Sequence, residues 1–431
     1  MNTINTHNLI LTTDSYKASH YLQYPPHSER VSSYIEARGG DYPQALFFGL
    51  QAFIKAHLLN PITRADIAEA EAILTAHGEP FNRAGWQHIL DVHQGHLPLA
   101  IEALPEGLVV PTGTTLVQVV NTDPQLPWLT SYLETALLRA VWYPTTVATI
   151  SWRIKQVIAD ALRQTSDGPP DQVLFKLHDF GARGVSSAES AALGGMAHLV
   201  NFRGTDTLEG ILAARRFYQA DMPGFSIPAA EHSTITCWGK DQEATAYANM
   251  LKQFAHPGKL LAVVSDSYDI YNAVSHIWGQ QLKSAVETRG ATVVIRPDSG
   301  IPHEVVVEVL ERLYQAFGGS VNQKGFKVLP PCIRVIQGDG INEAAIKLIL
   351  QRMQQAGFAA DNIAFGMGGA LLQHGNRDTL SFAMKASAIQ IAGQWQAVYK
   401  APVTDSGKRS KQGRLAVIQT AAGLATVPLE Q

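Results

Sequence analysis

In the second half of the chain, short apolar runs alternate with longer helical segments. The apolar runs lie at residues 259–266, 291–298, 332–339 and 362–366, and an earlier one ends near His178. Runs rich in Val, Ile and Leu throughout are typical of strands buried on both faces, and strands separated by helices form βαβ units. From about residue 172 the pattern therefore predicts an α/β fold with a parallel sheet, arranged as an irregular (β/α) barrel. An open doubly wound sheet is the alternative.

The first third of the chain has a different pattern. Strand-like segments are expected at residues 31–38 and 97–120, helices at 46–59, 63–77 and 128–164, and strands again after Ser381. This mixture predicts an additional α+β layer formed by the N-terminal part and the C-terminal strands. We expect an N-terminal α+β domain over residues 1–150, completed by 386–431, and a (β/α) barrel-like catalytic domain over 151–385.

Composition narrows the class of protein. A chain of 431 residues with 46% hydrophobic residues can bury a large core, and a net charge of −3 predicts no general affinity for nucleic acid or anionic membranes. Its two cysteines, Cys237 and Cys332, imply neither a disulfide framework nor a cysteine zinc site. The N-terminus lacks the features of a signal peptide, and no apolar run reaches the ~18 residues that span a bilayer. We expect a soluble, cytoplasmic protein.

Polar residues end each clear strand of the second half. They are His178-Asp179, Ser265-Asp266, Arg296-Pro297-Asp298, Gln337-Gly338-Asp339-Gly340 and Gly366-Met367-Gly368-Gly369. In parallel sheets and barrels, ligands bind at the C-terminal ends of the strands. A single Asp at a strand end is usually a helix N-cap. Four acids, an arginine and two glycine turns at successive strand ends favour a ligand site instead.

The residue types at these ends suit a phosphorylated sugar. Carboxylates can bind Mg²⁺ or ribose hydroxyls, and glycine turns can present backbone N–H groups to a phosphate. Arg183, Arg296 and Arg377 can hold phosphates in bidentate fashion, although each could equally form a surface ion pair. Phosphoryl, glycosyl and aldol chemistry fit such a site equally well.

His232 is a candidate for covalent chemistry, since it directly precedes an expected helix. A phosphorylated imidazole at a helix N-terminus would meet favourable backbone N–H groups, whereas a structural role is the alternative. The sequence contains no His-Glu-x-x-His motif, no Gly-x-Ser-x-Gly motif and no P-loop. The basic segment from Lys400 to Arg414 could bind a polyphosphate or form a solvated loop.

Several long segments resemble nicotinamide phosphoribosyltransferases, which belong to the type II phosphoribosyltransferases. These segments are residues 11–26, 176–187, 198–207, 227–241, 263–273, 295–300, 334–340, 363–369 and 408–415. The resemblance implies that nicotinamide and 5-phosphoribosyl 1-pyrophosphate (PRPP) react, with Mg²⁺, to give nicotinamide mononucleotide and pyrophosphate in NAD salvage. It also implies ATP as a co-substrate, hydrolysed through a phosphohistidine, and a homodimer with active sites shared between the subunits.

The resemblance assigns roles to individual residues. Phe180 and Tyr16 of the partner subunit would sandwich the pyridine ring, and Asp206 would accept a hydrogen bond from the carboxamide. His232 would be phosphorylated, with Asp266 orienting it.

Further assignments concern the ribose and the phosphates. The expected ligands of base and ribose are Arg296, Asp298, Gly338 and Asp339; those of the 5-phosphate are Arg183, Gly368 and Gly369; and those of pyrophosphate or ATP phosphates are Arg38, Arg377, Lys385 and Lys408. Of all these residues, the expected catalytic ones are His232, Asp266, Arg296 and Asp298. The Mg²⁺ ligands are not assigned.

Three other functions compete with this interpretation. A nicotinate phosphoribosyltransferase is disfavoured by Asp206, because a carboxylate there attracts an amide and repels nicotinate. A non-catalytic binding protein on the same scaffold is disfavoured by the joint retention of four residues: His232, Asp206, Arg296 and Asp298. An aldolase-like barrel would need a Schiff-base lysine, and no lysine ends a clear strand.

Overall fold

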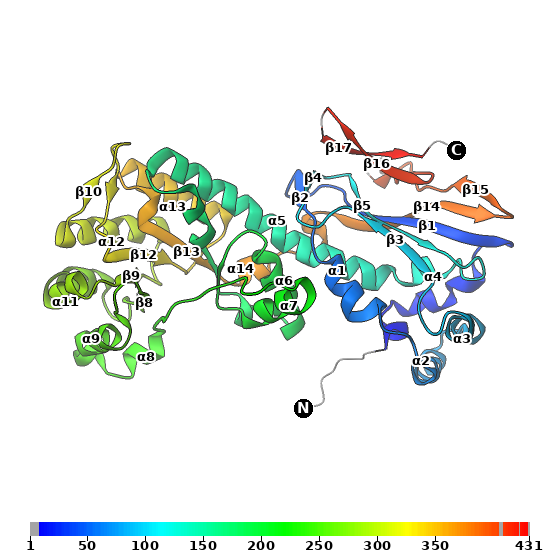
Figure 1. Cartoon of the computed structure of the whole chain (residues 1–431), viewed down its shortest axis with the longest axis horizontal. Helices are drawn as coiled ribbons and strands as arrows, with labels where there is room; N and C mark the ends of the chain where they lie inside the picture. The colour runs from blue at the N-terminus through cyan, green and yellow to red at the C-terminus, as the bar shows by residue number, and fades with distance from the viewer. Residues whose placement is uncertain (1–7, 405–407, 422, 430–431) are drawn as a thin grey trace. The chain divides into compact units, whose positions relative to one another are not determined.

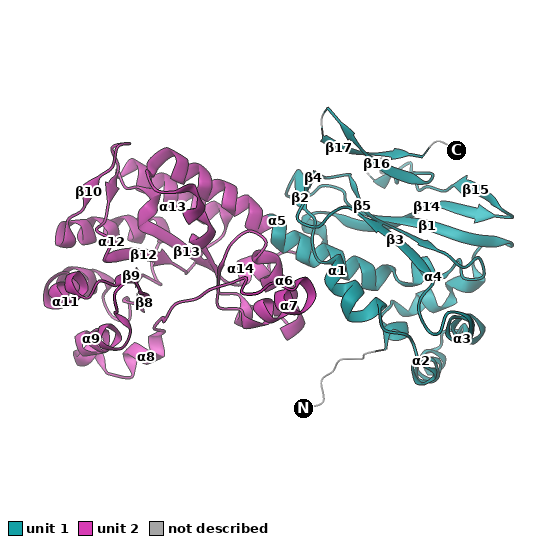
Figure 2. Ribbon diagram, viewed as in Figure 1, with its two compact units in different colours: residues 1–149, 376–431 teal, residues 150–375 magenta. Residues whose placement is uncertain are grey.

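A computed structural model describes residues 8–404, 408–421 and 423–429. The chain forms two compact units (Figure 2): unit 1 comprises residues 1–149 and 376–431, and unit 2 comprises residues 150–375. The first boundary falls inside the long helix α5 (Glu134–Thr165). Residues 376–385, which the sequence pattern places with the barrel, belong to unit 1.

Unit 1 is built on a five-stranded antiparallel sheet with the strand order β15-β14-β1-β5-β3 (Figure 1). The strands are β15 (Gln394–Ala397), β14 (Phe382–Ile391), β1 (Ser28–Ala37), β5 (Thr115–Asn121) and β3 (Leu99–Ala103). Strands β1 and β14 are far apart in sequence yet adjacent in the sheet, with Tyr34 opposite Lys385. Two small sheets pair β2 (Gln44–Leu46) with β4 (Val109–Pro111), and β16 (Leu415–Thr420) with β17 (Gly423–Pro428).

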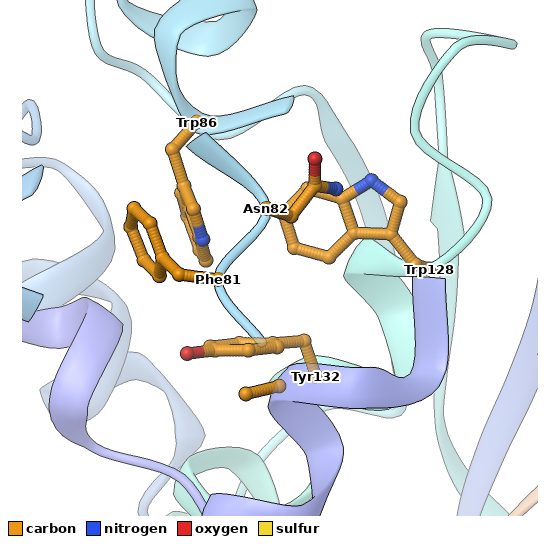
Figure 3. A pocket seen from close by; sticks show the side chains of 6 residues that line it. Phe81, Asn82, Trp86, Trp128 and Tyr132 are labelled. Atoms are coloured by element: carbon orange, nitrogen blue, oxygen red, sulfur yellow. The ribbon is translucent and has the colours of Figure 1, made fainter. Parts of the chain in front are cut away.

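The other helices of unit 1 are α1 (Leu50–Phe53), which continues as a π-helical turn over Ile54–Leu58, α2 (Arg64–His77), α3 (Arg83–Val92) and α4 (Leu129–Tyr132). Helix α2 begins at a capping box formed by Thr63 and Asp66, which satisfies two terminal N–H groups. An aromatic cluster ties α3 to α4 (Figure 3): the ring of Trp86 lies edge-on to Trp128, at 4.9 Å, and to Tyr132, at 5.1 Å.

Unit 2 is built on a six-stranded parallel sheet with the order β7-β6-β13-β12-β9-β8. Its strands are β7 (Gly204–Thr205), β6 (Leu177–Asp179), β13 (Ile363–Met367), β12 (Ile333–Gln337), β9 (Thr292–Arg296) and β8 (Leu260–Val264). The segment 225–229 bridges the two edge strands, since Phe225 pairs with Gly204 of β7 and Ala229 pairs with Ala262 of β8. The predicted α/β fold, with an irregular barrel and an additional α+β layer, is confirmed.

Helices follow the strands of unit 2, as the βαβ pattern predicts. They are α6 (Ala188–His198), α7 (Leu208–Tyr218), α8 (His232–Thr236), α9 (Glu243–Phe254), α10 (Ile270–Asn272) with a π-helical continuation over Ala273–Gln281, α11 (Lys283–Thr288), α12 (Pro302–Phe317), α13 (Glu343–Gln355) and α14 (Gly369–Leu372). A short hairpin pairs β10 (Ser320–Val321) with β11 (Lys327–Val328). Among the described helices, none is both long enough and apolar enough to cross a membrane.

The first barrel strand starts later than its apolar pattern predicts. Residues Pro170–Phe175 form a 3₁₀ turn, and β6 begins only at Leu177. The prolines at 169 and 170 fix φ and lack the N–H group that a strand ladder needs. Between turn and strand, the Lys176 ammonium donates to three backbone carbonyls, including that of Asp361 at 2.9 Å, and its burial lowers the pKa to about 8.

Candidate functional site

A pocket of about 250 Å³ opens at the C-terminal ends of the unit 2 strands. It is lined by His178, Phe180, Ala182, Arg183, Asp206, Ser226, Ile227, Ala229, Ala262, Arg296 and Ile336. Ala262, Ile336 and Ile227 belong to one small apolar cluster with the Phe180 ring, so the pocket combines an apolar floor with polar walls. This composition is typical of sites for small, partly aromatic molecules.

The Phe180 ring is held by close packing on glycine. A Cβ atom added at Gly366 would lie 1.9 Å from the ring, so only glycine at this position leaves room for it. The backbone N–H of Phe180 donates to the Met367 carbonyl at 2.9 Å. The guanidinium of Arg296 lies 5.4 Å from the ring centroid, at cation–π distance. The backbone therefore presents the ring at the pocket in a fixed place.

The Asp206 carboxylate is oriented by two neighbours. Its Oδ1 accepts hydrogen bonds from His178 Nε2, at 3.0 Å, and from the Ser226 hydroxyl. Burial alone would raise the pKa of Asp206, but these hydrogen bonds and the positive charge of Arg296 outweigh it and lower the pKa. The group is therefore a carboxylate at neutral pH. With Oδ1 occupied by two donors, Oδ2 is the oxygen that a pocket ligand would contact.

A buried histidine supports β7, the short strand that directly precedes Asp206. His198 lies between Ser151, whose hydroxyl is 3.0 Å from Nδ1, and the Gly204 carbonyl, which is 3.1 Å from Nε2. Burial lowers the pKa of His198, so the ring is neutral and donates through Nε2 to the carbonyl. Asp179, a strand-end acid in the sequence, is fully buried and caps the turn by accepting from the Gly181 N–H at 2.7 Å.

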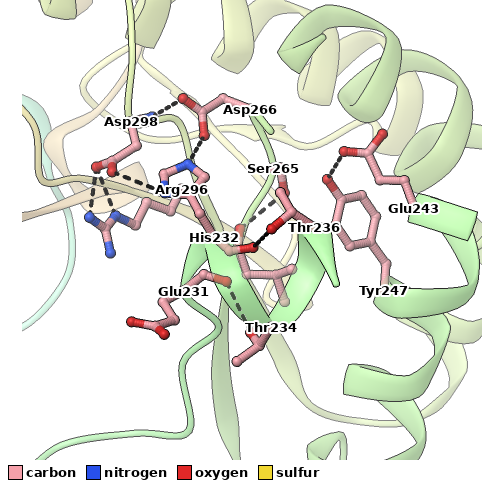
Figure 4. Close-up of polar contacts among 11 residues, drawn as sticks. Glu231, His232, Thr234, Thr236, Glu243, Tyr247, Ser265, Asp266, Arg296 and Asp298 are labelled. Atoms are coloured by element: carbon pink, nitrogen blue, oxygen red, sulfur yellow. Dashed lines mark hydrogen bonds and ion pairs between the residues drawn. The ribbon is translucent and has the colours of Figure 1, made fainter. Parts of the chain in front are cut away.

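A second polar group lies at the ends of β8 and β9 (Figure 4). His232 occupies the first position of α8, and its Nε2 lies 2.9 Å from Oδ1 of Asp266. The other oxygen of Asp266 accepts the Asp298 backbone N–H at 3.1 Å. Arg296 donates to Oδ1 of Asp298 through Nε and a terminal nitrogen, at 3.0 and 2.7 Å. The expected catalytic residues, His232, Asp266, Arg296 and Asp298, thus form one connected network.

Exposure distinguishes the members of this network. The side chain of His232 is 48% exposed, whereas that of Asp266 is 4% exposed. Because Nε2 faces the buried carboxylate, it carries the hydrogen, and Nδ1 keeps its lone pair. Nδ1 lies 3.9 Å from Oδ2 of Asp298. The imidazole is therefore fixed on one side and accessible on the other.

The glycine turns adjoin the pocket wall. A Cβ atom at Gly184 would lie 3.2 Å from the backbone of Gly369, so the turn that carries Arg183 packs directly on the start of α14. A Cβ atom at Gly338 would lie 3.2 Å from the Phe180 ring. Asp339 is exposed, and its carbonyl accepts from the Gln337 side chain at 3.0 Å.

The remaining expected ligands, Tyr16, Arg38, Arg377, Lys385 and Lys408, lie in unit 1. Tyr16 is 56% exposed. Arg38 donates to the Ser381 carbonyl at 3.2 Å, and Arg377 pairs with Asp378 on the surface. Lys408 is exposed.

Lys385 lies among other cations. Burial lowers its pKa, and although Glu134 acts in the opposite direction, the positive charges of Arg38, Lys400 and Lys17 lower the pKa further. The Lys385 ammonium donates to the Met384 carbonyl at 2.9 Å. A half-buried lysine close to three other cations favours the binding of a polyanion.

His198 and Ser226 were not predicted from the sequence, and His178 was identified only as a strand-end residue without a role. His178 lies two residues before Phe180, and alternation along the strand places both side chains on one face, a pattern that could have identified it. Ser226 lies in an irregular segment without a strand pattern, and only the bridges of residues 225–229 bring it to Asp206.

Two family models match the chain. Residues 175–427 match the nicotinate phosphoribosyltransferase (NAPRTase) family, and residues 8–101 match the N-terminal domain of nicotinamide phosphoribosyltransferase.

Curated relatives and a solved structure are similar over most of the chain. A nicotinamide phosphoribosyltransferase of Xanthomonas campestris pv. campestris (strain 8004) is 59% identical, covering 96% of this chain and 88% of the relative. One of Acinetobacter baylyi is 33% identical, covering 95% and 88%. The crystal structure of nicotinate-nucleotide pyrophosphorylase from Pyrococcus furiosus matches with a TM-score of 0.62 at 17% identity, covering 99% of this chain and 86% of that one. This last match shows likeness of fold.

Proposed function

Since this chain belongs to the nicotinate phosphoribosyltransferase family, we propose that it transfers the phosphoribosyl group of PRPP to nicotinamide, releasing pyrophosphate and forming nicotinamide mononucleotide. The relatives named nicotinamide phosphoribosyltransferase and the matching N-terminal domain support this choice within the family. The chain is thus an enzyme of the glycosyltransferase class, acting in NAD biosynthesis.

The observation that carries the choice of substrate is the ionised Asp206 in the pocket wall. A carboxamide N–H can donate to its Oδ2, whereas the carboxylate of nicotinate would meet a like charge at the same place. A like-charge contact of this kind in a partly desolvated site costs roughly several kcal/mol and therefore excludes nicotinate. His178 and Ser226 support this selectivity, because their hydrogen bonds keep Asp206 ionised.

Transfer needs no general base in this pocket, because the pyridine nitrogen is a neutral nucleophile. Phe180 would position the ring and Arg183 the phosphate, so that catalysis comes from orientation and from charge stabilisation. The carboxylates of Asp298 and Asp339 lie at neighbouring strand ends, where they would face an oxocarbenium-like ribose carbon. Hard oxygen donors of this kind fit Mg²⁺, which would neutralise charge on the leaving pyrophosphate.

ATP would be used through His232. Its Nδ1 would attack the terminal phosphorus of ATP, releasing ADP, and water would later hydrolyse the phosphohistidine. The hydrogen bond from Nε2 to the buried Asp266 supports this role, because it leaves the Nδ1 lone pair available. The ATP phosphates or pyrophosphate would be bound by the cations Arg38, Arg377, Lys385 and Lys408. The lowered pKa of Lys385 supports this, because neighbouring cations contribute to it and a bound anion would offset their charge.

The active unit would be a cytoplasmic homodimer. Tyr16 of the partner subunit would cover the second face of the pyridine ring, and the 56% exposure of this side chain within its own chain supports the assignment. Both cysteines, Cys237 and Cys332, are free. Mixing Tyr16→Ala and Phe180→Ala chains tests the sharing of sites, because each variant alone would lack one face of the ring-binding site, whereas mixed dimers would regain activity in one of their two sites.

The direct test of the function is a product assay with PRPP and Mg²⁺, using nicotinamide or nicotinate, with and without ATP. We expect nicotinamide mononucleotide to form with nicotinamide, and more of it when ATP is present. A preference for nicotinate would show a nicotinate phosphoribosyltransferase instead. The absence of a mononucleotide product with either base would leave a binding protein on an enzyme scaffold.

A further inference from the structure

Unit 1 contains a group of potential metal ligands outside the barrel. His88 lies on α3, His93 directly follows the end of α3, and Asp123 follows β5. One ligand atom from each residue lies within 4.8 Å of the other two. The group shares no residue with the pocket, the His232 network or the cation cluster around Lys385.

The geometry of this group is convergent. His88 Nε2 and His93 Nε2 each lie 2.7 Å from the same oxygen, Oδ2 of Asp123. The carboxylate is 9% exposed, and its other oxygen accepts the Gln125 N–H at 2.8 Å. The Asp123 carbonyl accepts from the Asn121 side chain at 2.7 Å. Backbone and side-chain hydrogen bonds thus hold Asp123 so that its Oδ2 faces both imidazoles.

We propose that His88, His93 and Asp123 form a zinc site, with water completing a tetrahedral shell. Zinc binds imidazole nitrogen and carboxylate oxygen at about 2.0–2.2 Å, so the ligand atoms of a tetrahedral shell lie roughly 3.3–3.6 Å apart. The two 2.7 Å distances are those of hydrogen bonds, and binding of the ion would lengthen each of them by less than roughly 1 Å. Two nitrogen donors suit zinc and disfavour Mg²⁺, so the site is different in kind from a magnesium site in the barrel.

Binding of zinc requires a change in the position of the hydrogen on each imidazole. While both imidazoles donate to Asp123, each ring carries a hydrogen on Nε2. Binding of the ion requires that each ring carry its hydrogen on Nδ1 instead, so that both Nε2 lone pairs face the metal.

The site would cross-link two segments that the aromatic cluster already brings together. Trp86 lies two residues before His88, and Trp128 lies five residues after Asp123; these two indoles pack edge-to-face (Figure 3). Both are buried. The metal would therefore stabilise the packing of α3 on the connection between β5 and α4, and the inference does not depend on the proposed catalytic function.

The test is zinc binding by the full chain after treatment with a chelator. Titration with Zn²⁺ at neutral pH, in competition with a chromophoric chelator, measures affinity, and native mass spectrometry measures stoichiometry. We expect one equivalent per chain and a higher Tm with zinc. His88→Ala and His93→Ala should each weaken binding at least roughly 10–100-fold. His96→Ala is the matched control, because His96 is exposed in the same region but lies outside the group.

Two results would overturn the proposal. One is the absence of stoichiometric zinc binding by the unaltered chain. The other is equal zinc binding by the unaltered chain and the folded His88→Ala/His93→Ala double variant; the group would then be only a hydrogen-bonded cluster. If the alanine variants do not fold, Asp123→Asn and His93→Gln replace them, with circular dichroism as the check on folding and the Zn²⁺-dependent change in Tm as the readout.

Discussion

The mouth of the barrel in unit 2 and the end of α3 in unit 1 each hold an imidazole Nε2 against a largely buried aspartate oxygen. The distance is 2.9 Å for His232 and Asp266, and 2.7 Å for both His88 and His93 with Asp123. His232 is 48% exposed, whereas His88 and His93 are 21% and 28% exposed. The same pair of side chains therefore occurs once in an open setting and once in a more closed one.

The number of imidazoles around each carboxylate determines what the group can do. One imidazole per carboxylate, at the start of a helix, leaves the His232 ring half exposed, as the proposed transfer of a phosphate to Nδ1 would require. Two imidazoles converging on one carboxylate oxygen bring three ligand atoms together. This arrangement suits the binding of a metal ion rather than the transfer of a group. Four variants test whether the two groups have these different roles.

The largest effect is expected from His232→Ala. Removal of the nucleophile should lower ATP hydrolysis by roughly 10³-fold or more, while some transfer from PRPP without ATP remains. The matched control is the His88→Ala/His93→Ala double variant, whose rate of ATP hydrolysis should stay within about 2-fold of that of the unaltered chain. Normal ATP hydrolysis by His232→Ala would place the phosphate on another residue.

A smaller loss is expected from Asp266→Asn. The amide keeps one oxygen acceptor but lacks the charge that holds the His232 tautomer and stabilises its cationic form, so ATP hydrolysis should fall roughly 10–10²-fold. The counterpart Asp123→Asn should leave it nearly unchanged. ATP hydrolysis is measured across pH for both variants; an unaltered pH profile in Asp266→Asn would contradict the orienting role.

Asp206→Ser should change selectivity more than rate. Without the carboxylate, nicotinate no longer meets a like charge, so the ratio of kcat/KM for nicotinamide over nicotinate should fall at least roughly 10-fold, or about 1.4 kcal/mol. His178→Gln should lower the ratio less, because the carboxylate remains. An unchanged ratio in Asp206→Ser would show that another group selects the amide.

The smallest effect is one of stability, in unit 1. Burial alone would raise the pKa of Asp123, but hydrogen bonds from His93, the Gln125 backbone and His88 outweigh it and lower the pKa to about 2. A carboxyl whose folded-state pKa lies below its unfolded value stabilises the fold above the unfolded pKa, and this stabilisation is lost as pH falls through the folded pKa. With metal chelated, Asp123→Asn should cost about 2 kcal/mol at pH 7 and about half as much at pH 3.

Urea unfolding at both pH values measures this difference. His96→Ala serves as the control and should show no such pH dependence. If Asp123→Asn lowered the free energy of unfolding equally at pH 7 and pH 3, the hydrogen bonds of the charged Asp123 to its two histidines would not contribute to stability.

Much of the barrel follows from local pattern. The apolar runs at 259–266, 291–298 and 332–339 contain β8, β9 and β12. A buried parallel strand must be apolar on both faces, and polar residues can resume only where it emerges at the mouth. For this reason the strand ends already indicated a ligand site that includes Arg296, whereas Phe180 was assigned by the resemblance; both residues line one pocket.

Contacts between distant segments could not be predicted in this way. Segment 225–229 has no strand pattern, yet it bridges β7 and β8 and brings Ser226 to Asp206. His88 and His93 are separated by four residues, a spacing that zinc sites use, but Asp123 lies 30 residues beyond His93. Only the packing of α3 against the β5–α4 connection brings the three together.

The sequence by itself determined which residues are buried in strands, where those strands end and which chemical groups stand at their ends, because these follow from the periodicity of one segment at a time. The tertiary structure alone decided which carboxylate meets which imidazole, and how exposed each pair remains. Such pairings depend on register and packing between segments tens or hundreds of residues apart, and no local pattern encodes them. His232 with Asp266, and His88 and His93 with Asp123, thus differ both in the number of imidazoles per carboxylate and in exposure.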